Sequence, residues 1–297
     1  MGYIKLFEEF VASLTESGNS VENARPFEQD EVEPTMKWLD KNVFKKIGLS
    51  GLGDDVAIIG SAGKKLPGDT SGDIDVAISA DKVAGALNVS LQNVLTALDT
   101  ELKRLGYVTK VAAGFNQVSI PAPIGGNIKN GVGQVDLMLS TDLNWSKFIY
   151  DSPDFRIGES QYKGAYRNIL LMSVIGQCFG KVLSKTDDGL TKEYEARVIR
   201  MNQGIVQIRK TFVGKNGLIK TAKLMRDFDK EITREPQEIM DMLFSGNHKP
   251  KEINTYEKLK ALIESGSFKF PEKVDPILAE FKMRMERSGL PLPKDIG

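Results

Sequence analysis

The amino-acid sequence predicts an α+β protein, in which a mixed sheet core flanked by helices is followed by a mainly helical C-terminal domain. Short apolar runs bounded by glycine, proline and aspartate are typical of strands, and they occur between residues 50 and 145. Longer segments with apolar residues at helical spacing lie among them. Strands mixed with long helices favour an α/β or α+β core.

The first fifty residues, 1–50, are expected to form helices that pack on this core. Apolar residues recur at helical spacing over residues 3–15 and again over residues 31–47. Residues 16–32 between them are polar and rich in glycine, serine and asparagine, which indicates a loop.

Residues 51–157 are expected to form the core itself. A helix is predicted over residues 88–105, with Gly106 as its terminator. Glycine- and proline-rich loops are expected at 61–72 and 121–133. Strands are predicted at residues 56–59, 73–78, 107–111, 117–120 and 134–139.

Residues 158–297 form the predicted C-terminal domain, which is expected to be mainly helical. One exception is a β-hairpin near 197–210, where two apolar runs flank Asn202-Gln203-Gly204. Residues 218–288 are expected to give several helices separated by prolines and glycines.

The composition excludes several classes of protein. One cysteine and one histidine rule out an internal disulfide and a zinc site made of several His and Cys ligands. The 40 basic residues balance the 40 acidic ones, so a nucleic-acid partner has to be held by a local basic patch. Residues 192–230 are rich in Lys and Arg and fit such a patch, and they fit a generic solvated face equally well.

Neither a signal peptide nor an apolar stretch of membrane-spanning length is evident in the sequence. We therefore expect a cytoplasmic protein without a membrane partner. The oligomeric state stays open.

The most informative stretch runs from the end of the first predicted strand through the second. Gly60-Ser61 ends a buried strand, where backbone N–H groups can face an anion, and Lys64 and Lys65 add positive charge to the same loop. Asp73 and Asp75 are two residues apart on a predicted strand, so both side chains project from one face. An Asp-x-Asp pair after a glycine also occurs in solvated turns.

A third carboxylate, Asp136, lies inside the apolar strand predicted at 134–139. Carboxylates that share a face repel each other unless a cation lies between them, and Mg²⁺ prefers oxygen ligands. If the strand of Asp136 neighbours that of Asp73 and Asp75, the three carboxylates can hold two Mg²⁺ ions, with Mn²⁺ as a possible substitute. Two such ions activate an attacking hydroxyl and stabilise leaving pyrophosphate.

These residues resemble the signature of the DNA polymerase β-like nucleotidyltransferase superfamily. The resemblance covers about residues 50–180, and Ser71-Gly72-Asp73-Ile74-Asp75-Val76 is most similar to the X-family polymerases. It implies a nucleotidyltransferase-type core in which Asp73 and Asp75 ligate both metals. It further implies that Asp136 ligates one metal and helps to activate the acceptor hydroxyl, and that Gly60 and Ser61 contact the nucleotide phosphates.

The resemblance also implies basic residues on the helix after the third strand. Lys163 and Arg167 stand at i and i+4 and are expected to share a helix face, which would either grip the triphosphate or be a merely solvated face. Tyr162 and Tyr166 share a face in the same way and are candidates to stack on a base, with core packing expected for at least one of them.

The chain departs from the X-family polymerases in three respects. It has Ala62-Gly63-Lys64-Lys65 where those enzymes usually carry arginines after Gly-Ser. No helix-hairpin-helix motif is recognisable in residues 1–50, and the C-terminal portion matches no known thumb domain. These departures argue against processive, template-directed DNA synthesis.

The expected function is therefore metal-dependent transfer of a nucleoside monophosphate from an NTP to an acceptor hydroxyl, with release of pyrophosphate. The favoured acceptor is the 3′ end of a nucleic acid, RNA or tRNA-like. Two alternatives stay open: nucleotidylation of a protein acceptor, as some toxins of the superfamily perform, and a non-catalytic nucleotide- or nucleic-acid-binding module. The base preference for the NTP is undetermined.

Overall fold

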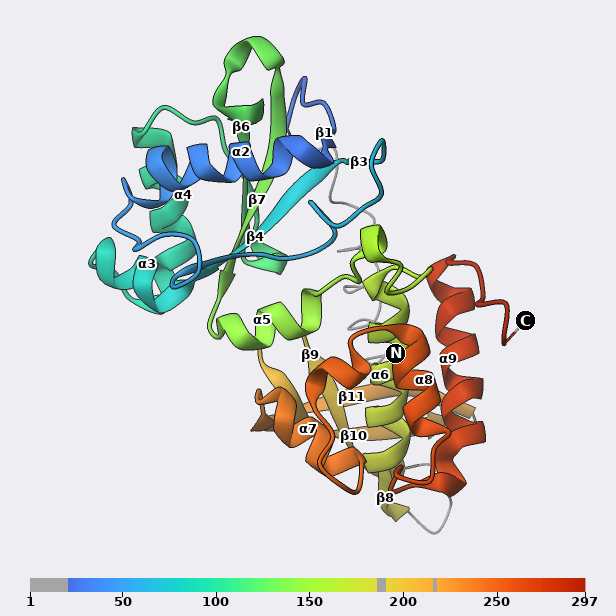
Figure 1. Ribbon diagram of the computed structural model, residues 1–297. Coiled ribbons are helices and arrows are strands. Elements are labelled where there is room, and N and C mark those ends of the chain that lie inside the picture. The colour runs from blue at the N-terminus through green and yellow to red at the C-terminus, as the bar shows by residue number, and fades with distance from the viewer. Residues whose placement is uncertain (1–20, 186–190, 216–217, 297) are drawn as a thin grey trace. The chain divides into compact units, whose positions relative to one another are not determined.

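The computed structural model describes residues 21–185, 191–215 and 218–296. The described chain forms two compact units that meet in the sequence at Gly164 (Figure 1). The N-terminal unit comprises residues 21–164 and the C-terminal unit comprises residues 165–296. The helix expected at 3–15 lies outside the described residues.

The N-terminal unit is built on a five-stranded mixed sheet with the strand order β2-β4-β7-β6-β5. Strands β4 and β7 are parallel, and every other neighbouring pair is antiparallel. The mixed sheet expected from the sequence is confirmed; strands β6 and β7 are each three residues longer than predicted, and β5 begins at Lys110 and not at residue 107. The strands are β2 (Val56–Ile58), β4 (Asp73–Ser79), β5 (Lys110–Ala112), β6 (Gln117–Pro123) and β7 (Val132–Ser140).

The two faces of this sheet differ in chemistry because side chains alternate along a strand. On one face, the apolar side chains of β4, β6 and β7 belong to a single buried cluster. The other face carries the polar residues that alternate with them, including Asp73, Asp75, Gln134 and Asp136. One side of the sheet therefore supplies the hydrophobic core, and the other is available for chemistry.

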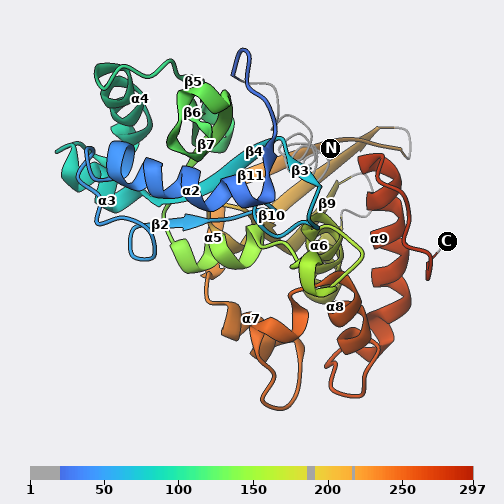
Figure 2. The same ribbon diagram turned by 45° about the horizontal axis from the view of Figure 1, so that its top comes forward.

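Helix α2 (Gln29–Leu39) covers the apolar face, where Figures 1 and 2 show it crossing the sheet. Its buried Val32, Met36 and Leu39 belong to the same cluster as the strands, which confirms that this N-terminal helix packs on the core. A π-helical turn, η1 (Asp40–Phe44), extends it. The other helices of the unit are α3 (Ala80–Ala86), α4 (Val94–Arg104) and α5 (Leu143–Tyr150).

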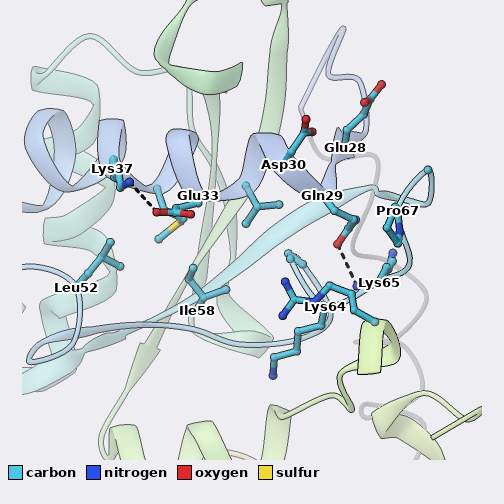
Figure 3. Close-up of a pocket in the computed structure, with 16 residues that line it drawn as sticks. Glu28, Gln29, Asp30, Glu33, Lys37, Leu52, Ile58, Lys64, Lys65 and Pro67 are labelled. Atoms are coloured by element: carbon cyan, nitrogen blue, oxygen red, sulfur yellow. Dashed lines mark hydrogen bonds and ion pairs between the residues drawn. The ribbon is translucent and has the colours of Figure 1, made fainter. Parts of the chain in front are cut away.

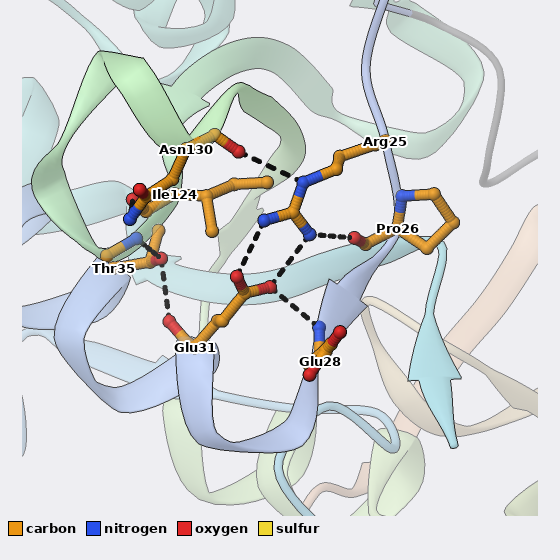
Figure 4. Close-up of polar contacts among 8 residues, drawn as sticks. Arg25, Pro26, Glu28, Glu31, Thr35, Ile124 and Asn130 are labelled. Carbon is orange, nitrogen blue, oxygen red and sulfur yellow. Dashed lines mark hydrogen bonds and ion pairs between the residues drawn. The ribbon is translucent and has the colours of Figure 1, made fainter. Parts of the chain in front are cut away.

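Polar contacts fix the beginning of α2 to the loop between β6 and β7 (Figure 4). The guanidinium of Arg25 donates to both carboxylate oxygens of Glu31, at 2.9 and 2.6 Å, and to the carbonyl of Asn130 at 3.0 Å. The backbone N–H of Glu28 donates to Glu31 as well, at 2.9 Å. The Arg25 hydrogen bond is the main cause that lowers the pKa of Glu31. Segment 25–31 is thus anchored beside the N-terminal end of β7.

The C-terminal unit differs from the mainly helical domain expected. Residues 181–233 form a four-stranded antiparallel sheet of β8 (Lys181–Lys185), β9 (Thr191–Arg200), β10 (Gly204–Lys215) and β11 (Leu218–Thr233). The hairpin expected near 197–210 is confirmed, with Arg200 opposite Gly204. The helices expected from residue 218 were wrong as far as Thr233, because that segment pairs along β10 and this pairing is not visible in local apolar spacing.

Helices account for the rest of the C-terminal unit: α6 (Gly164–Phe179), α7 (Pro236–Leu243), α8 (Tyr256–Ile263) and α9 (Val274–Ser288). Aromatic rings join three of them. Tyr166 of α6 meets Tyr256 of α8 edge-on at 6.4 Å, and Tyr256 stacks on Phe281 of α9 at 5.4 Å between ring centroids. Of the helices in the described residues, none combines the length and the apolar character needed to cross a membrane.

Candidate functional site

Three carboxylates meet on the polar face of the N-terminal sheet. Asp75 of β4 stands directly opposite Asp136 of the parallel strand β7, and Asp73 stands opposite Gln134. Oxygen atoms of Asp73, Asp75 and Asp136 all lie within 4.8 Å of one another. The neighbour relation between the two strands, which the sequence left as an assumption, is confirmed.

The three carboxylates destabilise one another's charged forms. Burial raises the pKa of Asp75 well above its ordinary value, and the charges of Asp73 and Asp136 raise it further. Burial also raises the pKa of Asp136, against the effect of hydrogen bonds from Ser119, Gln134 and Gln117. A cation among these oxygens would remove this cost, and three carboxylates are a suitable donor set for a hard divalent ion.

Gly60 comes closest to the Asp75 carboxylate from the neighbouring loop. Its φ is +70°, and a Cβ atom added there would lie 2.7 Å from Asp75 Oδ2. Only glycine combines this backbone conformation with so close an approach at little cost. Gly60 therefore lets the loop backbone lie close against the Asp75 carboxylate.

The backbone N–H of Gly60 was expected to face an anion, but it bonds to the protein itself. It donates to the carbonyl of Tyr150 at 3.0 Å, because the chain pairs briefly with the segment after α5 at this point. The next three amides, of Ser61, Ala62 and Gly63, have no hydrogen-bond acceptor in the described part of the chain. They follow one another in a turn that the Lys64 N–H closes on the Ser61 carbonyl at 3.1 Å. Consecutive free amides of this kind favour an anion.

The two lysines of the loop have different surroundings. Lys64 forms an ion pair with Asp151 and donates to the carbonyl of Ser152 at 3.1 Å. Lys65 donates to the carbonyl of Thr70 at 2.8 Å. Burial and the nearby positive charge of Lys163 lower the pKa of Lys65, whereas the charges of Asp73 and Asp69 act to raise it. Lys65 is thus close enough to interact electrostatically with Lys163 and with Asp73.

The expected pairing of Lys163 and Arg167 on one helix face was wrong. Helix α6 begins at Gly164, so the exposed Lys163 precedes it. Arg167 is only 1 % exposed, and its guanidinium donates to the Ile253 carbonyl at 3.0 Å and to Asn168 Oδ1 at 2.5 Å. These contacts lie within the C-terminal unit and give Arg167 a structural role there.

Of the two tyrosines considered for base stacking, Tyr166 packs in the core of the C-terminal unit. It is 7 % exposed, and its hydroxyl donates to the Pro291 carbonyl at 3.0 Å. The side chains of residues 210–229, which include four lysines of the predicted basic patch, lie outside the described residues.

The structure adds polar residues that the sequence reasoning missed. Gln134 and Ser119 are buried on the same face as Asp136, and both donate hydrogen bonds to it. Their signal was present in the sequence: Gln134 stands two residues before Asp136, and Ser119 interrupts an apolar run in the preceding strand. A period of two predicts that such residues share the face of the catalytic candidate.

A groove of about 880 Å³ lies elsewhere on the unit, between α2, β2 and the loop of residues 61–68 (Figure 3). Ile58 of β2 lines it and stands opposite Val76, which faces the hydrophobic core and not the carboxylates. The groove therefore opens on the opposite side of the sheet from Asp73, Asp75 and Asp136. Lys65 lines the groove and also lies within electrostatic reach of Asp73.

Comparisons of the chain with protein-family models, with curated proteins and with solved structures found no match.

Proposed function

We propose that this protein transfers a nucleoside monophosphate from an NTP to an acceptor hydroxyl and releases pyrophosphate, using two Mg²⁺ ions. One observation carries the proposal: carboxylates from two neighbouring parallel strands, Asp73, Asp75 and Asp136, converge within 4.8 Å on a polar sheet face. So many carboxylates in so small a space are costly unless cations join them.

Asp73, Asp75 and Asp136 would hold the ions. Gly60 supports this assignment because any larger residue at this position would meet the Asp75 carboxylate. Two divalent ions bound at such a site help to ionise the attacking hydroxyl and neutralise the charge on the leaving pyrophosphate.

In the proposed reaction, the acceptor oxygen forms a bond to the α-phosphorus of the NTP. The bond from that phosphorus to the oxygen that bridges to the β-phosphate breaks, and its electron pair leaves with pyrophosphate. Asp136 orients the acceptor hydroxyl and takes its proton.

The triphosphate is assigned to the turn that follows β2. The amides of Ser61, Ala62 and Gly63 point to this role because no acceptor in the described chain uses them. Lys65, and the exposed Lys163 near it, supply positive charge. Lys64 is a weaker candidate because its ammonium is bound to Asp151 and Ser152.

The acceptor in this proposal is the 3′-hydroxyl of a nucleic acid, with RNA favoured. The proposal is tested by incubating the full chain with each α-³²P-labelled NTP, Mg²⁺ or Mn²⁺, and three acceptors: RNA, DNA and bulk protein. An RNA whose 3′ end is blocked by a terminal 3′-deoxynucleotide is the matched control. We expect label on free RNA ends and none on blocked ends.

The double variant Asp73→Asn and Asp75→Asn is expected to lose transfer and keep its fold. The exposed Asp54→Asn is its control and should remain active. Label on protein alone would keep nucleotidyl transfer and overturn the RNA acceptor. NTP binding without transfer to any acceptor would leave only a nucleotide-binding module, and full activity of the double variant would refute the metal ligands.

A further inference from the structure

The Asp136 carboxylate is held from its own strand by a fully buried glutamine. The side-chain amide of Gln134 donates to both oxygens of Asp136, at 3.0 Å to Oδ1 and 3.1 Å to Oδ2. Both side chains are 0 % exposed. Ser119 of β6, directly opposite Asp136, and Gln117 of the same strand bond to the same carboxylate. Side chains of β6 and β7 thus donate hydrogen bonds to the Asp136 carboxylate.

The orientation of the Gln134 amide is fixed by a third partner. The backbone N–H of Val21 donates to Gln134 Oε1 at 3.1 Å. A backbone N–H can only donate, so it requires the oxygen end of the amide, and the NH₂ end must then face Asp136. The segment that carries Val21 is itself attached to β7, where the Arg25 N–H donates to the Val132 carbonyl at 2.9 Å.

We propose that Gln134 is a positioning residue for Asp136, and that the peptide N–H of Val21 sets the polarity of its amide. This inference rests on the proposed function in one respect, namely that Asp136 serves as a metal ligand and orients the acceptor. The segment from Val21 to Glu31 is therefore linked to the site through one peptide N–H, although it lies more than a hundred residues from Asp136 in the sequence.

The physical reason lies in what an Asp side chain can do on its own. A carboxylate can turn about its last bond, and each orientation presents its lone pairs to a different point. An amide that donates to both oxygens fixes the plane of the carboxylate. The oxygen lone pairs that accept no hydrogen bond from this amide then point away from it. Ser119 and Gln117 also bond to this carboxylate, and the Gln117 amide donates to Ser119 Oγ at 3.2 Å, but Gln134 donates to both carboxylate oxygens. Partners of this kind typically contribute 10- to 100-fold to metal affinity or activity.

The decisive variant is Gln134→Met, which keeps the approximate length of the side chain and removes both donors without adding charge. Gln134→Glu is its counterpart and places a second carboxylate against Asp136. Thr35→Val is the matched control, because Thr35 is also 0 % exposed and has two hydrogen bonds, to Glu31 and Gly125, that lie away from the carboxylates.

Two measurements are needed. Mn²⁺ binding is followed by the electron paramagnetic resonance signal of the free ion, which requires no reaction. Transfer is followed as kcat and as KM for the NTP. For Gln134→Met we expect Mn²⁺ to bind at least tenfold more weakly and kcat to fall at least tenfold, with KM changed less than threefold. Gln134→Glu should lose more kcat than Gln134→Met does.

A purely structural role would produce another pattern. Thr35→Val should lower the melting temperature and leave Mn²⁺ affinity and kcat within twofold of the wild type. If Gln134→Met lowers only the melting temperature in the same way, the inference is overturned.

The Val21 N–H gives a second test that does not depend on how well Gln134 variants fold. Val21→Pro removes the N–H, whereas Val21→Ala keeps it. We expect Val21→Pro to weaken Mn²⁺ binding and to lower kcat, and Val21→Ala to behave as the wild type. Equal behaviour of the two variants would refute the role assigned to this peptide group.

These outcomes separate the inference from the proposed function. A wild-type protein that binds Mn²⁺ and transfers no nucleotide would contradict the function, while the Mn²⁺ affinities of the Gln134 variants would still test the positioning role. If the wild type transfers nucleotide and Gln134→Met has unchanged Mn²⁺ affinity and kcat, only the positioning role is overturned. Absence of Mn²⁺ binding by the wild type would overturn both.

Discussion

Neutralising Asp75 should stabilise the metal-free protein, although it removes a residue of the candidate site. In the folded chain burial and the charges of Asp73 and Asp136 raise the pKa of Asp75. A carboxyl whose pKa is raised on folding favours the folded state while it is protonated. That contribution is complete below the unfolded pKa of 3.8 and is lost as the pH rises toward the folded pKa. Asp75→Asn abolishes the penalty at every pH.

The size of the effect follows from two estimates. Two unit charges 4.8 Å apart repel by about 3.5 kcal/mol at an effective dielectric constant of about 20, and Asp75 has two such neighbours. Protonation of Asp75 removes this repulsion and costs about 1.4 kcal/mol for each pH unit above 3.8. At pH 7 protonation therefore limits the penalty to about 4 kcal/mol. Because Asp75 is half-buried and keeps part of its hydration, we expect about 1–4 kcal/mol.

The assay is thermal unfolding in EDTA between pH 5 and pH 8. Asp75→Asn should raise the melting temperature of the transition that reports on residues 21–164 by several degrees at pH 7. The difference from the wild type should shrink as the pH falls toward 5. Added Mg²⁺ or Mn²⁺ should stabilise the wild type, by about 2.7 kcal/mol at a hundredfold excess over Kd, and should stabilise the variant much less.

The control is Asp54→Asn, which neutralises an exposed carboxylate and should leave the melting temperature within about one degree of the wild type. If metal-free Asp75→Asn melts at or below the temperature of the wild type at pH 7, the repulsion argument is wrong. The same conclusion follows if the difference between the two proteins does not change with pH.

Three further predictions concern Gly60, Lys65 and Arg167. Gly60→Ala should cost about 1–3 kcal/mol of stability and at least tenfold in Mn²⁺ affinity, measured by denaturant titration and metal titration, because its Cβ meets the Asp75 carboxylate. Lys65→Met should raise KM for the NTP about tenfold or more through the loss of one charged contact to phosphate, and an unchanged KM would remove Lys65 from the site. Arg167→Leu should destabilise the C-terminal unit by about 2–4 kcal/mol in a denaturant titration, since it leaves the Ile253 carbonyl without its donor, and should change KM less than twofold.

The fold of the N-terminal unit was largely predictable because its strands are short and clearly bounded. Strands β4 and β7 have apolar residues on one face and polar residues, including the three aspartates, on the other, so a period of two identified them. Helices α3 and α5 were missed because each is only 7 or 8 residues long and gives little periodic signal.

The C-terminal unit was less predictable. Strand β11 runs from Leu218 to Thr233, and apolar residues recur along it at intervals of three and four, as they would in a helix. Its structure depends on pairing with β10, which is a contact between separate segments. Arg167 was misassigned for a related reason, since its spacing from Lys163 is helical while the residue that accepts its hydrogen bond, Ile253, is 86 positions away.

The sequence by itself determined that Asp73 and Asp75 share a face, because adjacent alternate positions on a strand must do so. It also determined which residue types are available for metal and phosphate chemistry. The tertiary structure decided that β7 lies beside β4 in the register that places Asp136 opposite Asp75. It further decided that Gln134 and the Val21 N–H hold that carboxylate in place. Strand neighbours and buried hydrogen bonds are set by packing across the whole unit, and local periodicity carries no information about them.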